Sequence, residues 1–183
     1  MGGIPGANGL VRAAAVDSSG NLYIGGEFTI AGDLFAKNVA KWNGSSWTPL
    51  GSGVGRGVYA FAISGSDLYV GGDFTTAGGS AANYIAKWNG IDWTALGSGI
   101  GPVYALAISG TNVYAAGYGF VSRWNGSSWE ALGLGASHFV RALVSSGSNV
   151  YAGGSFWSAG DSPALAIASW SERQRLGSSG LGD

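Results

Sequence analysis

The first residues in this sequence that could do chemistry are two carboxylates at matching positions. Glu27 follows "LYIGG" and Asp73 follows "LYVGG", so each acid comes directly after the same glycine pair. Hydrolysis of a glycosidic bond needs two carboxyl groups about 5–10 Å apart across a cleft. Nothing in the sequence pairs these two acids uniquely, and acids that recur with a repeat mostly belong to turns. A glycosidase is therefore a weaker hypothesis than a binding protein.

The rest of the sequence offers little for catalysis or metal binding. It contains one histidine, His138, and no cysteine. No zinc site can be built from these, and no Ser-His-Asp set can be argued from His138. The acids that recur in the loops, Asp33 and Asp161, give one carboxylate per loop, whereas calcium requires several oxygen ligands. We expect no catalytic residue, no metal and no cofactor, and we expect His138 to be a surface-loop residue.

The composition indicates a packed protein with a weakly charged surface. Only 10% of the 183 residues are charged and 46% are hydrophobic, against about 25% charged in ordinary soluble domains. The formal net charge of −1 argues against a nucleic-acid partner, and no apolar run approaches the ~20 residues of a membrane span. The start "MGGIPGANGL" lacks the features of a signal peptide, so we expect any export signal to lie outside this sequence. The absence of cysteine is compatible with an extracellular or cell-envelope location, which is our expectation.

Three sequence markers recur four times in the same order. The first comprises "VRAAAV", "VYAFAI", "VYALAI" and "VRALVS", and the second comprises "LYIGGEF", "LYVGGDF", "VYAAGYG" and "VYAGGSF". The third is a tryptophan at positions 42, 88, 124 and 170, and of the eight tryptophans only Trp157 stands outside the repeat positions. The recurrences define repeats at approximately 10–56, 57–101, 102–137 and 138–183.

Each repeat is predicted to form four short antiparallel strands, A to D. The segments are rich in Val, Ile, Tyr and Trp and are separated by hairpin-turn sequences such as "SGSD" and "NGSS". Repeats of 40–50 residues with four such strands are typical of β-propeller blades. Simple alternation in "VYAFAI" predicts Val58 and Ala60 on one face of strand A and Tyr59 and Phe61 on the other. The sequence thus predicts one all-β domain over residues 1–183, a β-propeller of four repeats.

The same pattern resembles the kelch repeat across all four repeats. The kelch glycine pair is matched at positions 25–26, 71–72 and 153–154, whereas the third repeat departs from it with Ala116-Gly117. "GGDFTTAGG" followed by "YIAKWNG" is similar to kelch-like repeats of secreted or cell-surface proteins. The resemblance implies four antiparallel strands per repeat, with strand A innermost and strand D outermost. It implies almost nothing about activity, because propellers support many functions.

A binding site is predicted on the rim that carries the D–A links and the long B–C loops. Functional residues concentrate on loops held by a rigid scaffold. The first residues of strand A and the acids that end strand B should meet there. The candidate binding residues are Arg12, Tyr59, Tyr104, Arg141, Glu27 and Asp73. The alternative is that these side chains only cap a central channel. The third repeat is shorter between Gly117 and Arg123 and should leave a notch in this rim.

These observations predict a non-enzymatic scaffold or binding module with a protein or glycan ligand. The main alternative is a carbohydrate-binding, lectin-like propeller. We expect no nucleic-acid partner and no membrane insertion. Two arrangements of the repeats stay open: the four repeats close on themselves, or they form part of a larger ring that is completed by a second copy in a homo-oligomer or by more of the same chain.

Overall fold

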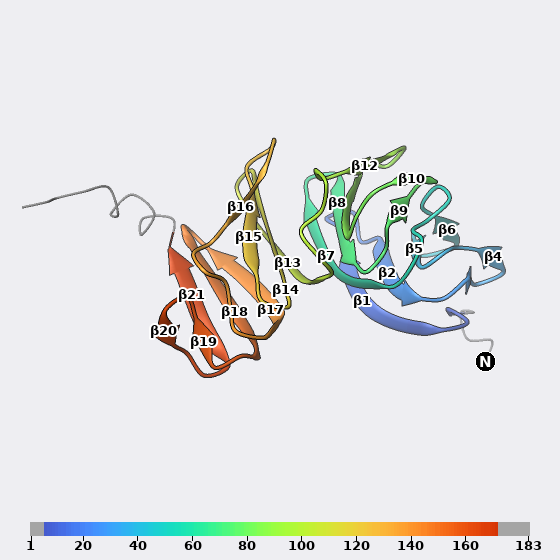
Figure 1. Cartoon of the computed structure of the whole chain (residues 1–183). Coiled ribbons are helices and arrows are strands. Elements are labelled where there is room, and N and C mark those ends of the chain that lie inside the picture. Colours follow the sequence, from blue (N-terminus) through green and yellow to red (C-terminus); the bar gives the residue numbers. More distant parts are fainter. Residues whose placement is uncertain (1–5, 172–183) are drawn as a thin grey trace, which may run out of the picture. The chain divides into compact units, whose positions relative to one another are not determined.

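The computed structural model describes residues 6–171, which form strands, turns and connecting segments (Figure 1). The fold is all-β, with antiparallel sheets throughout the described range. The chain divides into two compact units: the first ends at Leu106 and the second begins at Ala107. This boundary falls inside one strand, β13 (Val103–Ser109).

Four larger sheets correspond to the four predicted repeats. In the first three, strands A, B, C and D are neighbours in that order, as predicted; the fourth sheet contains A, B and C. Its predicted D strand lies beyond Ser171, outside the described residues. The strands, sheet by sheet, are β1 (Leu10–Val16), β2 (Leu22–Glu27), β5 (Val39–Trp42) and β6 (Trp47–Pro49); β7 (Val58–Ser64), β8 (Asp67–Gly72), β11 (Ile85–Trp88) and β12 (Trp93–Ala95); β13, β14 (Asn112–Gly117), β15 (Val121–Trp124) and β16 (Trp129–Ala131); and β17 (Phe139–Ser146), β18 (Asn149–Ser155) and β21 (Ile167–Ser171).

The long B–C loops of three repeats contain strands that were not predicted from the sequence. Each of these connections contains a small two-stranded hairpin, formed by β3 (Ile30–Ala31) with β4 (Leu34–Phe35), β9 (Thr76–Ala77) with β10 (Ser80–Ala81), and β19 (Ser158–Ala159) with β20 (Ser162–Pro163). A glycine with positive φ follows the first short strand in each case, for example Gly78 at 62°, and this conformation lets the chain reverse tightly. In the third repeat, three residues, 118–120, join β14 to β15.

The paired tryptophans mark the ends of strands C and D. Trp88 lies directly opposite Trp93 across the hairpin, with ring centroids 5.2 Å apart, and the equivalent pairs of the first and third sheets are at 5.4 Å. The turn between them is fixed by asparagine: Asn43 Oδ1 accepts hydrogen bonds from the backbone N–H groups of Ser45 and Ser46 at 2.9 and 2.8 Å. This explains why the Asn-Gly sequence recurs between the tryptophans.

A β-bulge near the start of strand A changes which residues share a face. The register shifts between Val58 and Ala60, so Tyr59 is the extra residue on β7. Beyond a bulge, simple alternation no longer holds. The prediction that Val58 and Ala60 lie on the same face of the strand is therefore wrong. Val58 instead shares its face with Phe61, and both reach Gly25 of the neighbouring sheet in the first unit.

The glycine pair in strand B makes two different close approaches possible. A Cβ on the first glycine, Gly71, would lie 2.5 Å from Cγ1 of Val103 on the next strand A. A Cβ on the second glycine, Gly72, would collide with the carbonyl oxygen of Gly57, next to the bulge. The core of the first unit is built around this contact between neighbouring sheets, with Val39, Val58 and Val70 fully buried.

Candidate functional site

The predicted binding residues of strand A lie at its bulges. The strand register shifts across Arg12 on β1, Tyr59 on β7 and Arg141 on β17, which makes each of them the extra residue. A bulged residue has no single partner on the next strand, so its side chain can be aimed away from the ladder. Tyr104, the second residue of β13, occupies the corresponding sequence position.

In the first unit, four of the predicted residues form a continuous cluster. Arg12 Nε donates a hydrogen bond to Glu27 Oε1 at 2.8 Å, and the guanidinium carbon of Arg12 lies 5.6 Å from the centre of the Tyr59 ring. Tyr59 in turn stacks on Tyr104 with centroids 5.3 Å apart and an interplanar angle of 4°. The groups are therefore in contact in the order Glu27 carboxylate, Arg12 guanidinium, Tyr59 phenol and Tyr104 phenol. The Arg12 cation lies over the face of the Tyr59 ring.

Asp73 completes this cluster together with a residue that the sequence analysis missed. Arg56 Nε lies 3.8 Å from Asp73 Oδ2. Burial raises the pKa of Tyr59 to about 12, and the negative charges of Asp73 and Glu27 add to that rise. Arg56 could have been found from the sequence, because it stands in the D–A link three residues before the bulge. We name these first-unit residues, Arg12, Glu27, Arg56, Tyr59, Asp73 and Tyr104, the charged rim.

In the second unit, the corresponding positions are mostly aromatic. His138 contacts three rings, with centroid distances of 5.0 Å to Tyr118, 4.8 Å to Phe139 and 5.6 Å to Trp157. The guanidinium of Arg141 lies 4.8 Å from the Phe139 ring centre. Tyr118 follows strand B just as Glu27 and Asp73 do. We name Tyr118, His138, Phe139, Arg141 and Trp157 the aromatic rim.

The aromatic rim combines exposed rings with a partly buried polar group. Trp157 is 60% exposed and Tyr118 is 58% exposed. His138 is half-buried, and its Nδ1 atom is buried without a hydrogen-bond partner among the described residues. His138 lies in a loop before β17, as predicted, and the structure adds that its half-buried ring packs into an aromatic cluster. Sequence spacing offered a signal, because Trp157 is the one tryptophan outside the repeat positions.

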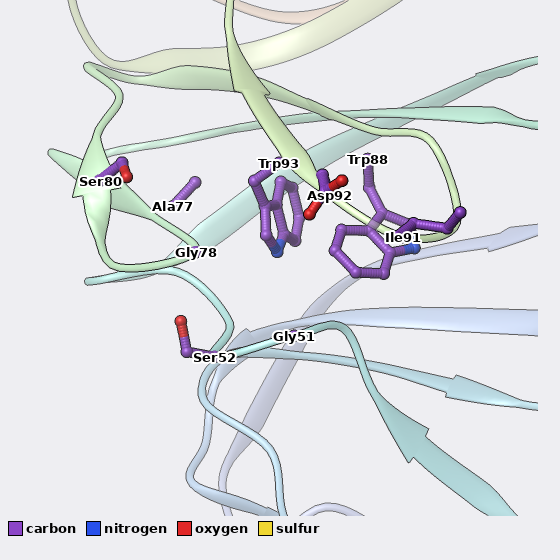
Figure 2. A pocket seen from close by; sticks show the side chains of 9 residues that line it. All are labelled: Gly51, Ser52, Ala77, Gly78, Ser80, Trp88, Ile91, Asp92 and Trp93. Carbon is purple, nitrogen blue, oxygen red and sulfur yellow. The ribbon is translucent and has the colours of Figure 1, made fainter.

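A small cavity in the first unit presents a second arrangement of tryptophans (Figure 2). It has a volume of about 220 Å³. Figure 2 shows the indole rings of Trp88 and Trp93 facing the opening, with Gly51 and Ser52 across from them. The Trp93 N–H is satisfied by the Leu50 carbonyl at 2.9 Å. The polar side chains of the lining are Ser52, Ser80 and Asp92. The spacing of the tryptophans did not predict this cavity.

Other kinds of site were sought over the same part of the chain. Within residues 6–171, no three His, Asp or Glu side chains gather closely enough to hold a metal ion. A helix of the length and hydropathy needed to cross a membrane does not occur in this described range.

Comparison with known proteins gives structural similarity without a family. No family model matches the chain, and no curated protein matches it. The crystal structure of the computationally designed Ika4 protein is similar with a TM-score of 0.64 and 17% identity, over 93% of this chain and 99% of that one. The computationally designed Ika8 protein is similar over 91% of this chain and 46% of its own length, with a TM-score of 0.58 and 16% identity.

A natural protein shares the same arrangement over part of its length. The extracellular domain of the one-component system BT4673 from B. thetaiotaomicron has a TM-score of 0.58 and 13% identity, over 86% of this chain and 20% of that one. At these identities the similarity establishes the fold alone, an all-β arrangement of antiparallel sheets.

Proposed function

We propose that this chain is a non-enzymatic binding module, built from four kelch-like β-propeller repeats and belonging to an exported protein. The meander order of strands in the sheets and the shared loop-bearing rims support the propeller assignment. The weakly charged, cysteine-free composition supports a location outside the cytoplasm. The function itself rests on one observation, the exposure of Trp157 and Tyr118 around His138.

Exposed aromatic rings at a loop rim favour a binding role. Large apolar side chains gathered at the surface lose the free energy that burial would provide, and such patches commonly mark interaction sites. The rings of Trp157 and Tyr118 offer broad apolar faces, while Arg141 offers hydrogen-bond donors beside them. A ligand with one apolar face and several polar groups would match this combination.

A carbohydrate is the ligand class that fits this description best. The C–H face of a pyranose ring can stack on an indole or phenol ring, and its hydroxyls can bond to nearby polar groups. The cavity beside Trp88 and Trp93 supports the same ligand class, because it pairs indole rings with Ser52, Ser80 and Asp92. This cavity, with a volume of about 220 Å³, is small enough to hold a single sugar unit rather than a protein surface.

The acids predicted as glycosidase candidates support binding rather than hydrolysis. Glu27 is engaged by Arg12 at 2.8 Å, and Asp73 lies 3.8 Å from Arg56. A glycosidase requires one carboxylic acid that is free to protonate the leaving group. Two carboxylates that each face a guanidinium do not provide such an acid, so we do not assign catalysis to them.

The test is a glycan array followed by titration calorimetry with the best oligosaccharide. We expect Trp157→Ala and Tyr118→Ala to reduce affinity by about tenfold or more, the loss of roughly 1.4 kcal/mol. Phe35→Ala is the matched control, because Phe35 is also an exposed aromatic residue, 68% accessible on the β3–β4 hairpin of the first unit. Absence of any bound glycan, or full retention of binding in both rim variants, would contradict the carbohydrate proposal. Turnover of reporter glycosides would contradict the non-enzymatic assignment.

A further inference from the structure

Neighbouring sheets of the first unit pack against each other through the same type of contact at two places. Val58 and Phe61 of the second sheet pack on Gly25 of the first. In the same way, Val103 and Leu106 pack on Gly71 of the second sheet. We call the surface that carries the valine the head face of a sheet, and the surface that carries the first glycine of the pair the tail face.

Within the second unit, the described residues leave the tail face of the fourth sheet uncovered. Tyr151 is 39% exposed, whereas the equivalent Tyr114 of the third sheet is 1% exposed. Ile167 is 69% exposed, whereas Ile85 at the same position of the second sheet is fully buried. The atoms within 4 Å of a Cβ built on Gly153 belong to Ala142 and Ala166 of the same repeat, so no described residue of a neighbouring sheet packs on this glycine as Val58 packs on Gly25. The fourth sheet therefore carries an apolar surface that its equivalents bury.

The head face of the first sheet is uncovered as well. Val11 is 46% exposed, whereas Val58, Val103 and Val140 at the same position in the other sheets are fully buried. Val16, further along the same strand, is also exposed. These two open faces carry the same residue types that meet inside the first unit: a valine on one side and a tyrosine and glycine on the other. The contacts inside the first unit are the model for how these two faces would pack together.

We propose that the tail face of the fourth sheet docks on the head face of the first sheet of a second copy of this chain. Each face is left exposed by the described residues of its own unit, so each copy offers one of each to its neighbour. The contact joins two different surfaces and is therefore heterologous, which generates a ring when the rotation closes and a filament when it does not. The surface is apolar on both sides, so the association needs no charge complementarity. This inference is independent of what the rims bind.

Sedimentation velocity on the full chain, from low to high micromolar concentration, tests the proposal. The parent should sediment as species larger than a monomer. Val11→Asp places an unpaired charge on the head face and Ile167→Asp places one on the tail face, so each variant alone should be monomeric. Ile91→Asp is the matched control: Ile91 is 78% exposed on a C–D turn away from both faces, and this variant should associate like the parent.

Mixing the two variants distinguishes a head-to-tail contact from any other association. Val11→Asp keeps an intact tail face and Ile167→Asp keeps an intact head face. An equimolar mixture should therefore form a dimer of one copy of each and grow no further. A parent that stays monomeric at every concentration overturns the proposal. This holds even if both variants lower the melting temperature, because the two faces would then close on each other within one chain. A mixture that stays monomeric, or variants that associate like the parent, overturn it equally.

Discussion

The charged rim and the aromatic rim occupy equivalent positions in the sequence repeat and differ in the contacts that their side chains make. In the charged rim, each acid faces an arginine and Tyr59 stacks on Tyr104. In the aromatic rim, Tyr118 stands where the acids stand, and the exposed face of Trp157 has no equivalent in the first unit.

This difference shows that the repeat sets where side chains go but not whether they are free to bind. A guanidinium that already bonds to a carboxylate exchanges that partner when it bonds to a ligand. This exchange contributes little to the free energy of binding. An exposed ring loses only water when a ligand stacks on it. For this reason we propose the aromatic rim as the binding surface, although both rims rest on the same bulged backbone.

The prediction with the largest expected effect concerns the bulged backbone that both rims share. A Cβ at Gly72 or Gly154 would collide with the carbonyl oxygen beside the bulge, that of Gly57 or Phe139. We expect Gly72→Ala and Gly154→Ala each to lower the free energy of unfolding by about 3 kcal/mol, because backbone must move to relieve the overlap. Gly153→Ala is the matched control, since a Cβ there would meet nothing closer than an ordinary van der Waals contact at 3.8 Å, and it should stay within about 0.5 kcal/mol of the parent. Urea denaturation measures all three; equal losses at Gly153 and Gly154 would break the shared-backbone interpretation.

A smaller effect, visible only at high pH, should sharpen the account of the charged rim. The fold raises the pKa of Tyr59 from 10.0 to about 12, so it favours the neutral phenol. This contribution is fully present below pH 10 and is lost as the pH rises through about 12. The loss should be about 1 kcal/mol, because the ring is partly exposed and solvent screens the charges of the acids. Tyr59→Phe should unfold with a correspondingly weaker pH dependence than the parent between pH 10 and 12. An identical pH profile for the two proteins would count against the coupling of Tyr59 to the acids.

The smallest effect concerns the aromatic rim and has the opposite sign. His138→Phe keeps an aromatic ring among Tyr118, Phe139 and Trp157 while removing the buried Nδ1 atom that has no partner there. Replacing an unsatisfied polar atom by an apolar one should stabilise the fold by up to about 1 kcal/mol. Thermal melting at neutral pH measures the change. A clear destabilisation would show that His138 makes a polar contact that the fold needs, and the contrast between the two rims would weaken.

The sequence predicted the strands well because its signals were local. Hairpin chemistry in "NGSS" fixes the C–D turn, and Asn43 makes the expected backbone hydrogen bonds. The order A to D follows from such turns, since consecutive hairpins place each strand beside the previous one. The recurrence of Trp88 and Trp93 at strand ends could likewise be read from spacing alone.

The details that shape the rims could not be predicted because they depend on register and on the neighbouring sheet. A bulge shifts the alternation by one residue, and nothing in "VYAFAI" marks Tyr59 as the extra residue. The burial of His138 depends on Tyr118 and Trp157, which are about twenty residues away on either side. The sequence placed Arg12 near Glu27, yet it could not show that Arg56 would face Asp73.

The bulges have a consequence for how this scaffold can acquire new specificities. A residue that pairs with no partner in the ladder can be exchanged without altering the pairing of the strands, and the bulge positions 12, 59 and 141 already hold Arg, Tyr and Arg. Structural requirement and surface chemistry are thereby separated: glycines at fixed places preserve the backbone, while the adjacent bulge is open to substitution. A gene encoding such a repeat can change what its product recognises one codon at a time, and a combinatorial library confined to these positions would explore recognition while leaving folding largely untouched.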